Sequence, residues 1–220
     1  MQIAIDGPAG AGKSTIAKRL ARESGYIYVD TGAMYRAMAL FLIRQGISAD
    51  DREGIENACG NADITIRYID GEQNVILNGE NVNGLIRTQE VSNMASASSV
   101  NGRVREKLVA LQQKLAASED VVMDGRDIGT VVLPNAEVKI FLTASSAVRA
   151  KRRYDELTAK GETCDINVIE KEIIERDERD MTREISPLKQ AEDAILVDTS
   201  DMSIDEVVAA IKKIVKGEKI

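Results

Sequence analysis

Apolar residues gather in five short runs, each of a length suited to a buried strand. They lie at residues 3–6, 26–29, 121–123, 138–142 and 195–197. Between these runs, apolar positions recur every three or four residues, as in Met34, Ala37, Met38 and Phe41, which is the period of an amphipathic helix. Buried strands that alternate with helices predict an α/β fold of three layers, in which a five-stranded parallel sheet has helices on both faces.

One stretch departs from this rhythm. Residues 64–69 alternate apolar and polar side chains, Asp70 and Gly71 have the composition of a tight turn, and a second run follows at 74–79. This pattern predicts an antiparallel hairpin. We expect residues 59–100 to form a small insert that ends in a polar helix around 87–98. A decorated loop is the alternative, since an isolated hairpin is marginally stable.

Proline is scarce and no flexible linker interrupts the chain. We therefore expect residues 1–220 to form a single domain, in which 1–58 and 101–220 make the core.

The first strand leads into a segment that matches the phosphate-binding pattern G-x-x-x-x-G-K-[ST]. Glycines let consecutive backbone N–H groups turn inward, and the following helix adds positive charge at its N-terminus. A glycine-rich turn with a surface lysine is the alternative, but the strand before the motif and the helix after it favour a nucleoside triphosphate site. The expected binding residues are Gly7, Pro8, Ala9, Gly10, Ala11, Gly12, Lys13, Ser14 and Thr15.

Three residues in this region suit phosphate and metal chemistry. Lys13 has the reach to contact the β- and γ-phosphates, and the Ser14 hydroxyl suits Mg²⁺. Asp124 directly follows the strand at 121–123, and a carboxylate at a strand end beside a phosphate loop commonly holds the metal or its waters. We therefore expect Ser14 and Asp124 to hold Mg²⁺.

The amino-acid composition excludes several classes of enzyme and of binding partner. The 220 residues include no histidine, which excludes a Ser-His-Asp hydrolase and a histidine-ligated zinc enzyme. The absence also favours an acceptor that is already anionic, because such an acceptor needs no general base. A net charge of −7 argues against nucleic acid as a partner. The two cysteines, Cys59 and Cys164, lack metal-like spacing and suggest reduced thiols in the cytoplasm. No apolar run has the length of a membrane span.

Charged residues that follow the strands indicate a second substrate, because ligands of such sheets bind beyond the carboxyl ends of the strands. Asp30 or Thr31 opens a helix and is either a simple N-cap or part of the site, with Arg36 one turn later. Arg126 and Asp127 follow the third strand, and here a solvent-exposed ion pair is the alternative to ligand binding.

Two later segments carry arginines at helical spacing. Arg149, Arg152 and Arg153 follow the fourth strand, where a helix can close over a triphosphate, although a solvated basic face is the alternative. Arg176, Asp180 and Arg183 lie along one stripe, which also fits an exposed helix with ordinary ion pairs. Composition does not separate these interpretations.

Taken together, these segments resemble bacterial cytidylate kinases over nearly the whole chain. The phosphate loop is generic to nucleotide-binding proteins, whereas the hairpin insert and the Asp-Gly-Arg-Asp and Glu-Arg-Asp segments are more specific. The matching segments are the phosphate loop and residues 30–36, 87–91, 124–130 and 175–180.

The resemblance implies transfer of a phosphoryl group from ATP to CMP or dCMP with Mg²⁺, on a nucleoside monophosphate kinase fold. In it, residues 59–100 bind the monophosphate and residues 146–165 form a mobile lid. It implies that three groups of residues bind the acceptor nucleotide. Cytosine would be bound by Ser96, Arg105 and Asp127, and the sugar by Arg176 and Asp180. The acceptor phosphate would be bound by Arg36, Arg126 and Arg183. Thr31 and Tyr35 would line the site, and Lys13, Arg126, Arg149, Arg152 and Arg153 would supply catalytic charge.

Two rival functions stay open from the sequence. One is a kinase for another small acceptor, such as AMP, dTMP or shikimate. The other is a nucleotide-binding switch without turnover, although the chain has no Asn-Lys-x-Asp segment for reading guanine. We expect a cytoplasmic monomer that binds neither nucleic acid nor membrane.

Overall fold

The computed structural model describes residues 1–218, which form two compact units. The first unit, here called the core unit, combines Met1–Tyr26 with the residues from Val121 onward. The second, here called the inserted unit, comprises Ile27–Asp120. Its bounds are wider than the insert expected at residues 59–100.

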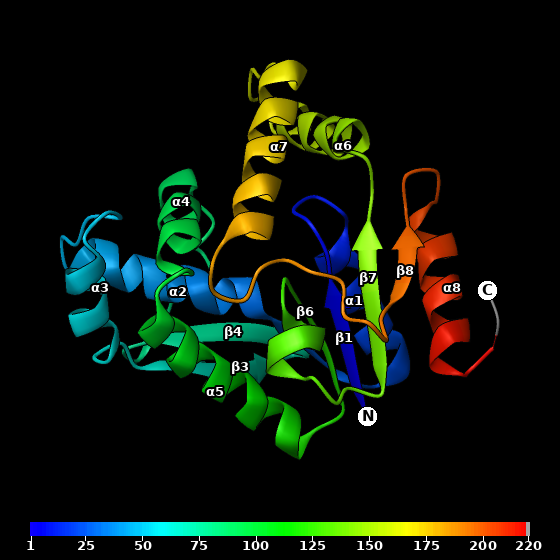
Figure 1. Ribbon diagram of the computed structural model, residues 1–220, viewed down its shortest axis with the longest axis horizontal. Helices are drawn as coiled ribbons and strands as arrows, with labels where there is room; N and C mark the ends of the chain where they lie inside the picture. The colour runs from blue at the N-terminus through cyan, green and yellow to red at the C-terminus, as the bar shows by residue number, and fades with distance from the viewer. Residues whose placement is uncertain (219–220) are drawn as a thin grey trace. The chain divides into compact units, whose positions relative to one another are not determined.

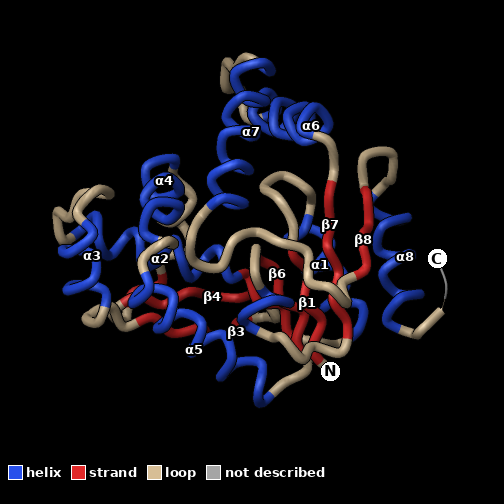
Figure 2. Tube along the Cα trace, in the orientation of Figure 1, coloured by secondary structure: helices blue, strands red, loops and turns tan. Residues whose placement is uncertain are grey.

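A five-stranded sheet has the order β2-β6-β1-β7-β8, of which β1, β7 and β8 can be followed in Figure 2. The strands are β1 (Gln2–Asp6), β2 (Ile27–Asp30), β6 (Val121–Gly125), β7 (Val138–Thr143) and β8 (Ile195–Asp198). Ile3 of β1 is aligned with Val122 on one side and with Val138 on the other, and both pairings are parallel. The predicted α/β fold and all five predicted strands are confirmed.

Four α-helices accompany the strands within the core unit: α1 (Lys13–Ser24), α6 (Ser146–Ala159), α7 (Ile166–Thr182) and α8 (Ile204–Val215). Helix α1 packs on β6 and β1 and also against α8, which itself packs on β7. These two helices therefore cover one face of the sheet. Helices α6 and α7 pack together beyond the carboxyl end of β7 (Figure 1). A short π-helix, η1 (Ile128–Val132), follows β6 and contacts β1.

The apolar runs are buried as their pattern predicts. In β1, Ile3, Ala4 and Ile5 have no exposed surface, and neither do Val121, Val122 and Met123 of β6. A central parallel strand has both faces covered, which explains why its apolar residues run continuously instead of alternating.

The inserted unit is built around α2 (Thr31–Arg44), which packs against the three other helices and the small sheet of this unit. The helices are α3 (Arg52–Cys59), α4 (Gln89–Ser98) and α5 (Gly102–Ser118), and the strands are β3 (Ile64–Ile69), β4 (Glu72–Leu77) and β5 (Glu80–Asn81). Met34, Met38 and Leu42 of α2 are fully buried. Because its side chains meet neighbours on several sides, α2 lies at the centre of the core of this unit.

The predicted hairpin and the polar helix after it are confirmed as β3–β4 and α4. Asp70 and Gly71 have φ values of 53° and 77°, as a two-residue turn between twisted strands requires. Strand β5 adds a third strand that the sequence pattern did not predict, because its two residues are too few to show an alternation. None of the helices described in residues 1–218 combines the length and the apolar character that crossing a membrane requires.

Candidate nucleotide-binding site

The phosphate loop joins β1 to α1 within the core unit. Gly7 has φ 148°, and a Cβ atom on this residue would lie 1.9 Å from the Leu142 carbonyl oxygen in β7. Only glycine permits this approach of the loop to the neighbouring strand. Gly12, with φ 88°, is the N-cap of α1 and has open space beside it. The backbone therefore turns tightly at the end of β1, and α1 begins directly after the turn, at Lys13.

The Lys13 side chain is folded into this loop. Only 5% of Lys13 is exposed, and its Nζ atom donates to the Pro8 carbonyl oxygen at 2.7 Å. Burial lowers the pKa of Lys13 well below its ordinary value, and the charge of Arg126 lowers it further, while Asp124, Asp6 and Asp180 oppose the shift. The lysine thus lies among charges from β1, from the end of β6 and the loop after it, and from α7.

Ser14 and Asp124 are in contact across the core unit. The Ser14 hydroxyl donates to Oδ2 of Asp124 at 2.9 Å, and Asp124 is 5% exposed at the end of β6. A hydroxyl beside a carboxylate is a pair of hard oxygen donors that suits Mg²⁺. No group of three or more His, Cys, Asp and Glu side chains suited to a metal occurs in the described residues. This donor set fits an ion that keeps most of its ligands as water and phosphate oxygens.

Two ion pairs connect the loop after β6 to the segment around the end of α7. Arg126 Nε donates to Oδ2 of Asp180 at 2.8 Å, and Arg183 Nη2 lies 3.7 Å from Oδ1 of Asp127. Burial raises the pKa of Asp180, but the charges of Arg126, Arg176 and Arg183 together hold it below its ordinary value. The fold therefore brings together all five residues that the sequence analysis named in these two segments.

The π-helix η1 begins directly after Asp127, and Asp6 from β1 binds its first amides. Oδ1 of Asp6 accepts from Ile128 N at 2.8 Å and Oδ2 accepts from Gly129 N at 2.7 Å. Burial raises the pKa of Asp6 from 3.8 to about 6, although these two backbone hydrogen bonds lower it. Sequence reasoning missed this residue. The available signal was a carboxylate at the inner end of an otherwise apolar strand, where a buried charge needs dedicated partners.

The three arginines of α6 differ in their surroundings. Arg149 is 5% exposed and donates to both carboxylate oxygens of Asp177, at 3.1 and 2.6 Å, and to the carbonyl oxygens of Ala9 and Ala144, both at 2.9 Å. Arg152 donates to the Thr199 carbonyl oxygen at 2.7 Å, and the exposed Arg153 pairs with Glu156. Arg149 therefore joins the phosphate loop to α7, and its expected supply of positive charge to the transferring group stays a prediction.

In the inserted unit, Asp30 is the N-cap of α2, since its Oδ1 atom accepts from Ala33 N at 2.8 Å. Thr31 is the buried first residue of the helix. The other oxygen of Asp30, Oδ2, accepts from Arg36 Nη2 at 3.1 Å and lies 3.5 Å from Arg87 Nη2. Arg87 belongs to a segment that carried the family resemblance, but no individual role was expected for it.

Arg105 and Tyr35 are in contact within the same unit. The guanidinium carbon of Arg105 lies 5.7 Å from the centre of the Tyr35 ring, and Nη1 donates to the Ser99 carbonyl oxygen at 3.3 Å. Arg105 is 4% exposed although it is charged, and a cation over an aromatic face is partly compensated for the loss of water. Ser96 is half-buried on α4.

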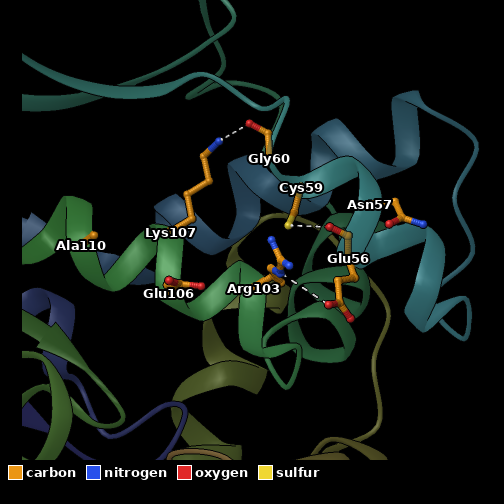
Figure 3. Close-up of a pocket in the computed structure, with 8 residues that line it drawn as sticks. All are labelled: Glu56, Asn57, Cys59, Gly60, Arg103, Glu106, Lys107 and Ala110. Atoms are coloured by element: carbon orange, nitrogen blue, oxygen red, sulfur yellow. Dashed lines mark hydrogen bonds and ion pairs between the residues drawn. The ribbon is translucent and has the colours of Figure 1, made fainter.

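A separate hollow lies between α3 and α5 and contains none of the expected site residues (Figure 3). In it, Lys107 Nζ donates to the Gly60 carbonyl oxygen at 2.7 Å, and Arg103 pairs with Glu56 at 3.5 Å. Lys107 and Arg103 in this hollow are thus already paired with neighbouring groups.

Comparisons with known proteins identify the family of this chain. A family model described as Cytidylate kinase matches residues 3–217. A cytidylate kinase from Caldicellulosiruptor bescii is 53% identical, with 99% of this chain and 98% of the relative covered. One from Lactobacillus johnsonii is 52% identical, with coverages of 100% and 95%. A shikimate kinase from Bacteroides thetaiotaomicron has a TM-score of 0.51 at 14% identity, covers 98% of each chain and is similar in fold alone. The chain belongs to the cytidylate kinase family and is therefore an enzyme, a nucleoside monophosphate kinase.

Proposed function

We propose that this enzyme transfers the γ-phosphoryl group of ATP to CMP or dCMP and yields ADP with CDP or dCDP. A phosphate oxygen of the acceptor forms the new bond to the γ-phosphorus, while the bond to the oxygen bridging the β- and γ-phosphorus breaks. The attacking oxygen is already anionic, so no proton has to be removed, in keeping with a chain that has no histidine. Catalysis is then positioning together with charge stabilisation.

The observation that carries this proposal is electrostatic. Arg126 and Asp180, two residues assigned to the acceptor, form an ion pair of 2.8 Å. Burial is the main cause of the low pKa of Lys13 in the phosphate loop, but the charge of Arg126 also lowers it and that of Asp180 raises it. The donor-binding lysine and the acceptor-binding pair therefore act on one another within the core unit. A transferring phosphoryl group needs positive charge from both directions, and Lys13 and Arg126 supply it.

On the donor side, backbone amides of residues 7–15 bind the phosphate chain and Lys13 exchanges the Pro8 carbonyl for phosphate oxygens. Ser14 and Asp124 hold Mg²⁺, in keeping with their contact and their oxygen chemistry. The ion, when bound, offsets negative charge on the β- and γ-phosphates. The charges of Arg152 and Arg153 on α6 complete the donor side when the lid at residues 146–165 closes over it. Arg149 holds the loop against α7.

On the acceptor side, Asp127 accepts from the amino group of cytosine, while Ser96 and Arg105 donate to N3 and O2. Uracil presents a carbonyl in place of that amino group, and a carbonyl facing a carboxylate is left unpaired or repelled. Thr31 and Tyr35 line this part of the site.

The acceptor phosphate is bound by Arg36, Arg126 and Arg183, and the sugar by Arg176 and Asp180. The Nε atom of Arg36 is buried and has no hydrogen-bond partner among residues 1–218, which supports binding of an anion there. The low pKa of Asp180 keeps it ionised, as an acceptor of hydrogen bonds from sugar hydroxyls requires.

A panel of acceptors tests this function. The purified enzyme is given ATP and Mg²⁺ with CMP, dCMP, UMP, AMP, dTMP or shikimate, and ADP release is followed by a coupled assay. We expect CMP and dCMP to be used at least tenfold better than the others, judged by kcat/KM. Better use of another acceptor would overturn the proposed substrate. Tight ATP binding without acceptor-dependent ADP release would indicate a binding module instead.

A further inference from the structure

Asp6 occupies an unusual position for a carboxylate. It is the last residue of β1, which has strands paired on both sides, and it is 4% exposed. Each carboxylate oxygen accepts one backbone amide, Ile128 N at 2.8 Å and Gly129 N at 2.7 Å. These amides are the first two of η1, which starts directly after Asp127. A side chain fixed on the central part of the sheet therefore binds the start of the helix that follows Asp127.

An aspartate at the N-cap of a helix ordinarily turns its own carboxylate back onto the first free amides. Asp127 is the N-cap residue of η1, yet it makes no such side-chain hydrogen bond. Asp6 makes the capping contacts instead, from 122 and 123 positions away in the sequence. The Asp127 carboxylate lies beside Arg183, 3.7 Å from its Nη2 atom, and not against the amides of its own helix.

The start of η1 is also closely packed. A Cβ atom on Gly129 would lie 3.2 Å from Cδ of Lys139 and 3.4 Å from Oδ2 of Asp6. The Lys139 ammonium group is held by both oxygens of Asp193, at 2.9 and 2.7 Å. The glycine backbone therefore lies between the Asp6 carboxylate and a lysine stem whose end is fixed, and the first turn of η1 has little freedom to shift.

We propose that Asp6 is a positioning residue for base recognition: by capping η1 in place of Asp127, it keeps the Asp127 carboxylate available to the acceptor base. This inference rests on the proposed role of Asp127. Without the cap from Asp6, the two amides would lack an acceptor in a buried place. Asp127 is the N-cap residue of η1, so its carboxylate is the one that could replace Asp6 in the ordinary way. The same carboxylate cannot cap the helix and bind the amino group of cytosine in full, so the two tasks compete.

The test begins with Asp6→Asn, which keeps the shape but places an NH₂ group against a backbone N–H. We expect the CMP-to-UMP ratio of kcat/KM to fall at least tenfold, through a higher KM for CMP, while the KM for ATP changes less than twofold. Asp51→Asn is the matched control, because Asp51 caps α3 through Gly54 N and that helix bears none of the residues assigned to the site. Its selectivity stays within twofold of wild type.

A double-mutant cycle shows whether Asp6 acts through Asp127. In an Asp127→Asn background, Asp6→Asn should cause less than a twofold further loss of selectivity. Amide hydrogen exchange supplies a readout independent of substrate: the Ile128 and Gly129 amides should exchange faster in Asp6→Asn, while the amides of β1 keep their protection. If Asp6→Asn does not fold, Gly129→Ala keeps the carboxylate and crowds the same contact, with a smaller loss in the same direction expected.

Wild-type selectivity in Asp6→Asn, an equal rise in the KM values for CMP and ATP, or additive losses in the cycle would each overturn the inference. An unchanged CMP-to-UMP ratio in Asp127→Asn alone is a different result. It would remove Asp127 from base recognition and, with it, the proposed function of this loop.

Discussion

Arg126 and Asp180 form an ion pair between the loop after β6 and helix α7, with Nε of Arg126 2.8 Å from Oδ2 of Asp180. Both side chains are assigned to the acceptor nucleotide, one to its phosphate and one to its sugar. In the structure their charges neutralise each other. The pair therefore holds the two groups in place, and a binding nucleotide has to exchange this contact for its own.

This relationship predicts the effect of Asp180→Asn. The substitution removes a charged partner of Arg126 and an acceptor for the sugar, and hydrogen bonds to charged groups are worth about 1.5–3 kcal/mol. We expect kcat/KM for CMP to fall roughly 10- to 100-fold, while the KM for ATP changes less than threefold. Asp205→Asn, which removes an exposed ion pair with Arg19 of α1, is the control. Equal losses for both substrates would contradict the assignment of Asp180 to the acceptor.

Lys13→Met should abolish most turnover without damage to the fold. The ammonium group is the charge nearest to the incoming phosphates, and its loss is expected to lower kcat by about a hundredfold or more. Burial disfavours the charged form of Lys13, so an apolar side chain of similar size should leave the melting temperature unchanged or raise it. Steady-state kinetics and circular dichroism measure the two effects. Lys18→Met, on an exposed position of α1, is the control and should retain activity.

Two glycines of the phosphate loop should respond differently to alanine. Both have positive φ values, 148° at Gly7 and 88° at Gly12, but only Gly7 has a backbone atom in the way, the Leu142 carbonyl oxygen. We expect Gly12→Ala to cost about 1–2 kcal/mol of unfolding free energy from backbone strain. Gly7→Ala should cost more than about 4 kcal/mol, because β1 and β7 would have to separate. Urea denaturation compares the two variants, and similar values would contradict this explanation.

The stability of the protein should depend on pH through Asp6. Its pKa is about 6 in the folded protein, against an ordinary 3.8, so the folded state binds a proton more tightly than the unfolded state does. The stabilisation that follows is fully present below about pH 4 and is lost as the pH rises through about 6, a change of roughly 2–3 kcal/mol.

The Asp6→Asn variant has no carboxyl group at this position, so it cannot bind the proton that stabilises the folded wild-type protein. Relative to the variant, the wild-type protein should therefore lose unfolding free energy between pH 4 and 7, as measured by urea denaturation at several pH values. A difference between the two proteins that is constant across this range would show that Asp6 does not titrate there.

The strands, the hairpin and the phosphate loop could be predicted from the sequence because each depends on interactions between residues that are close together in the chain. Residues 3–5 are apolar because a central parallel strand is covered on both faces. Asp70 and Gly71 form the turn because its backbone needs positive φ. The helix at 89–98 likewise begins at a side-chain cap, Thr88, which accepts from Val91 N. Such signals lie within a few residues of the feature that they predict.

The hydrogen-bond and ion-pair partners of the site residues could not be predicted from the sequence. Nothing near Asp127 in the sequence indicates that Asp6 caps its helix, and nothing near Arg149 indicates that Asp177 and the Ala9 carbonyl occupy its guanidinium group. The π-helix after Asp127 was also missed, since its five residues carry no periodicity and its capping group comes from another strand.

The alternation of strands and helices, the phosphate loop and the residue types that follow each strand can be predicted from the amino-acid sequence, because apolar periodicity and glycine geometry are properties of short segments. Which charges meet depends on how the chain folds: Arg126 with Asp180, Arg183 with Asp127, and Asp6 with the amides of η1. A buried charge is stable only beside its partner. The fold brings that partner from a segment far away in the chain.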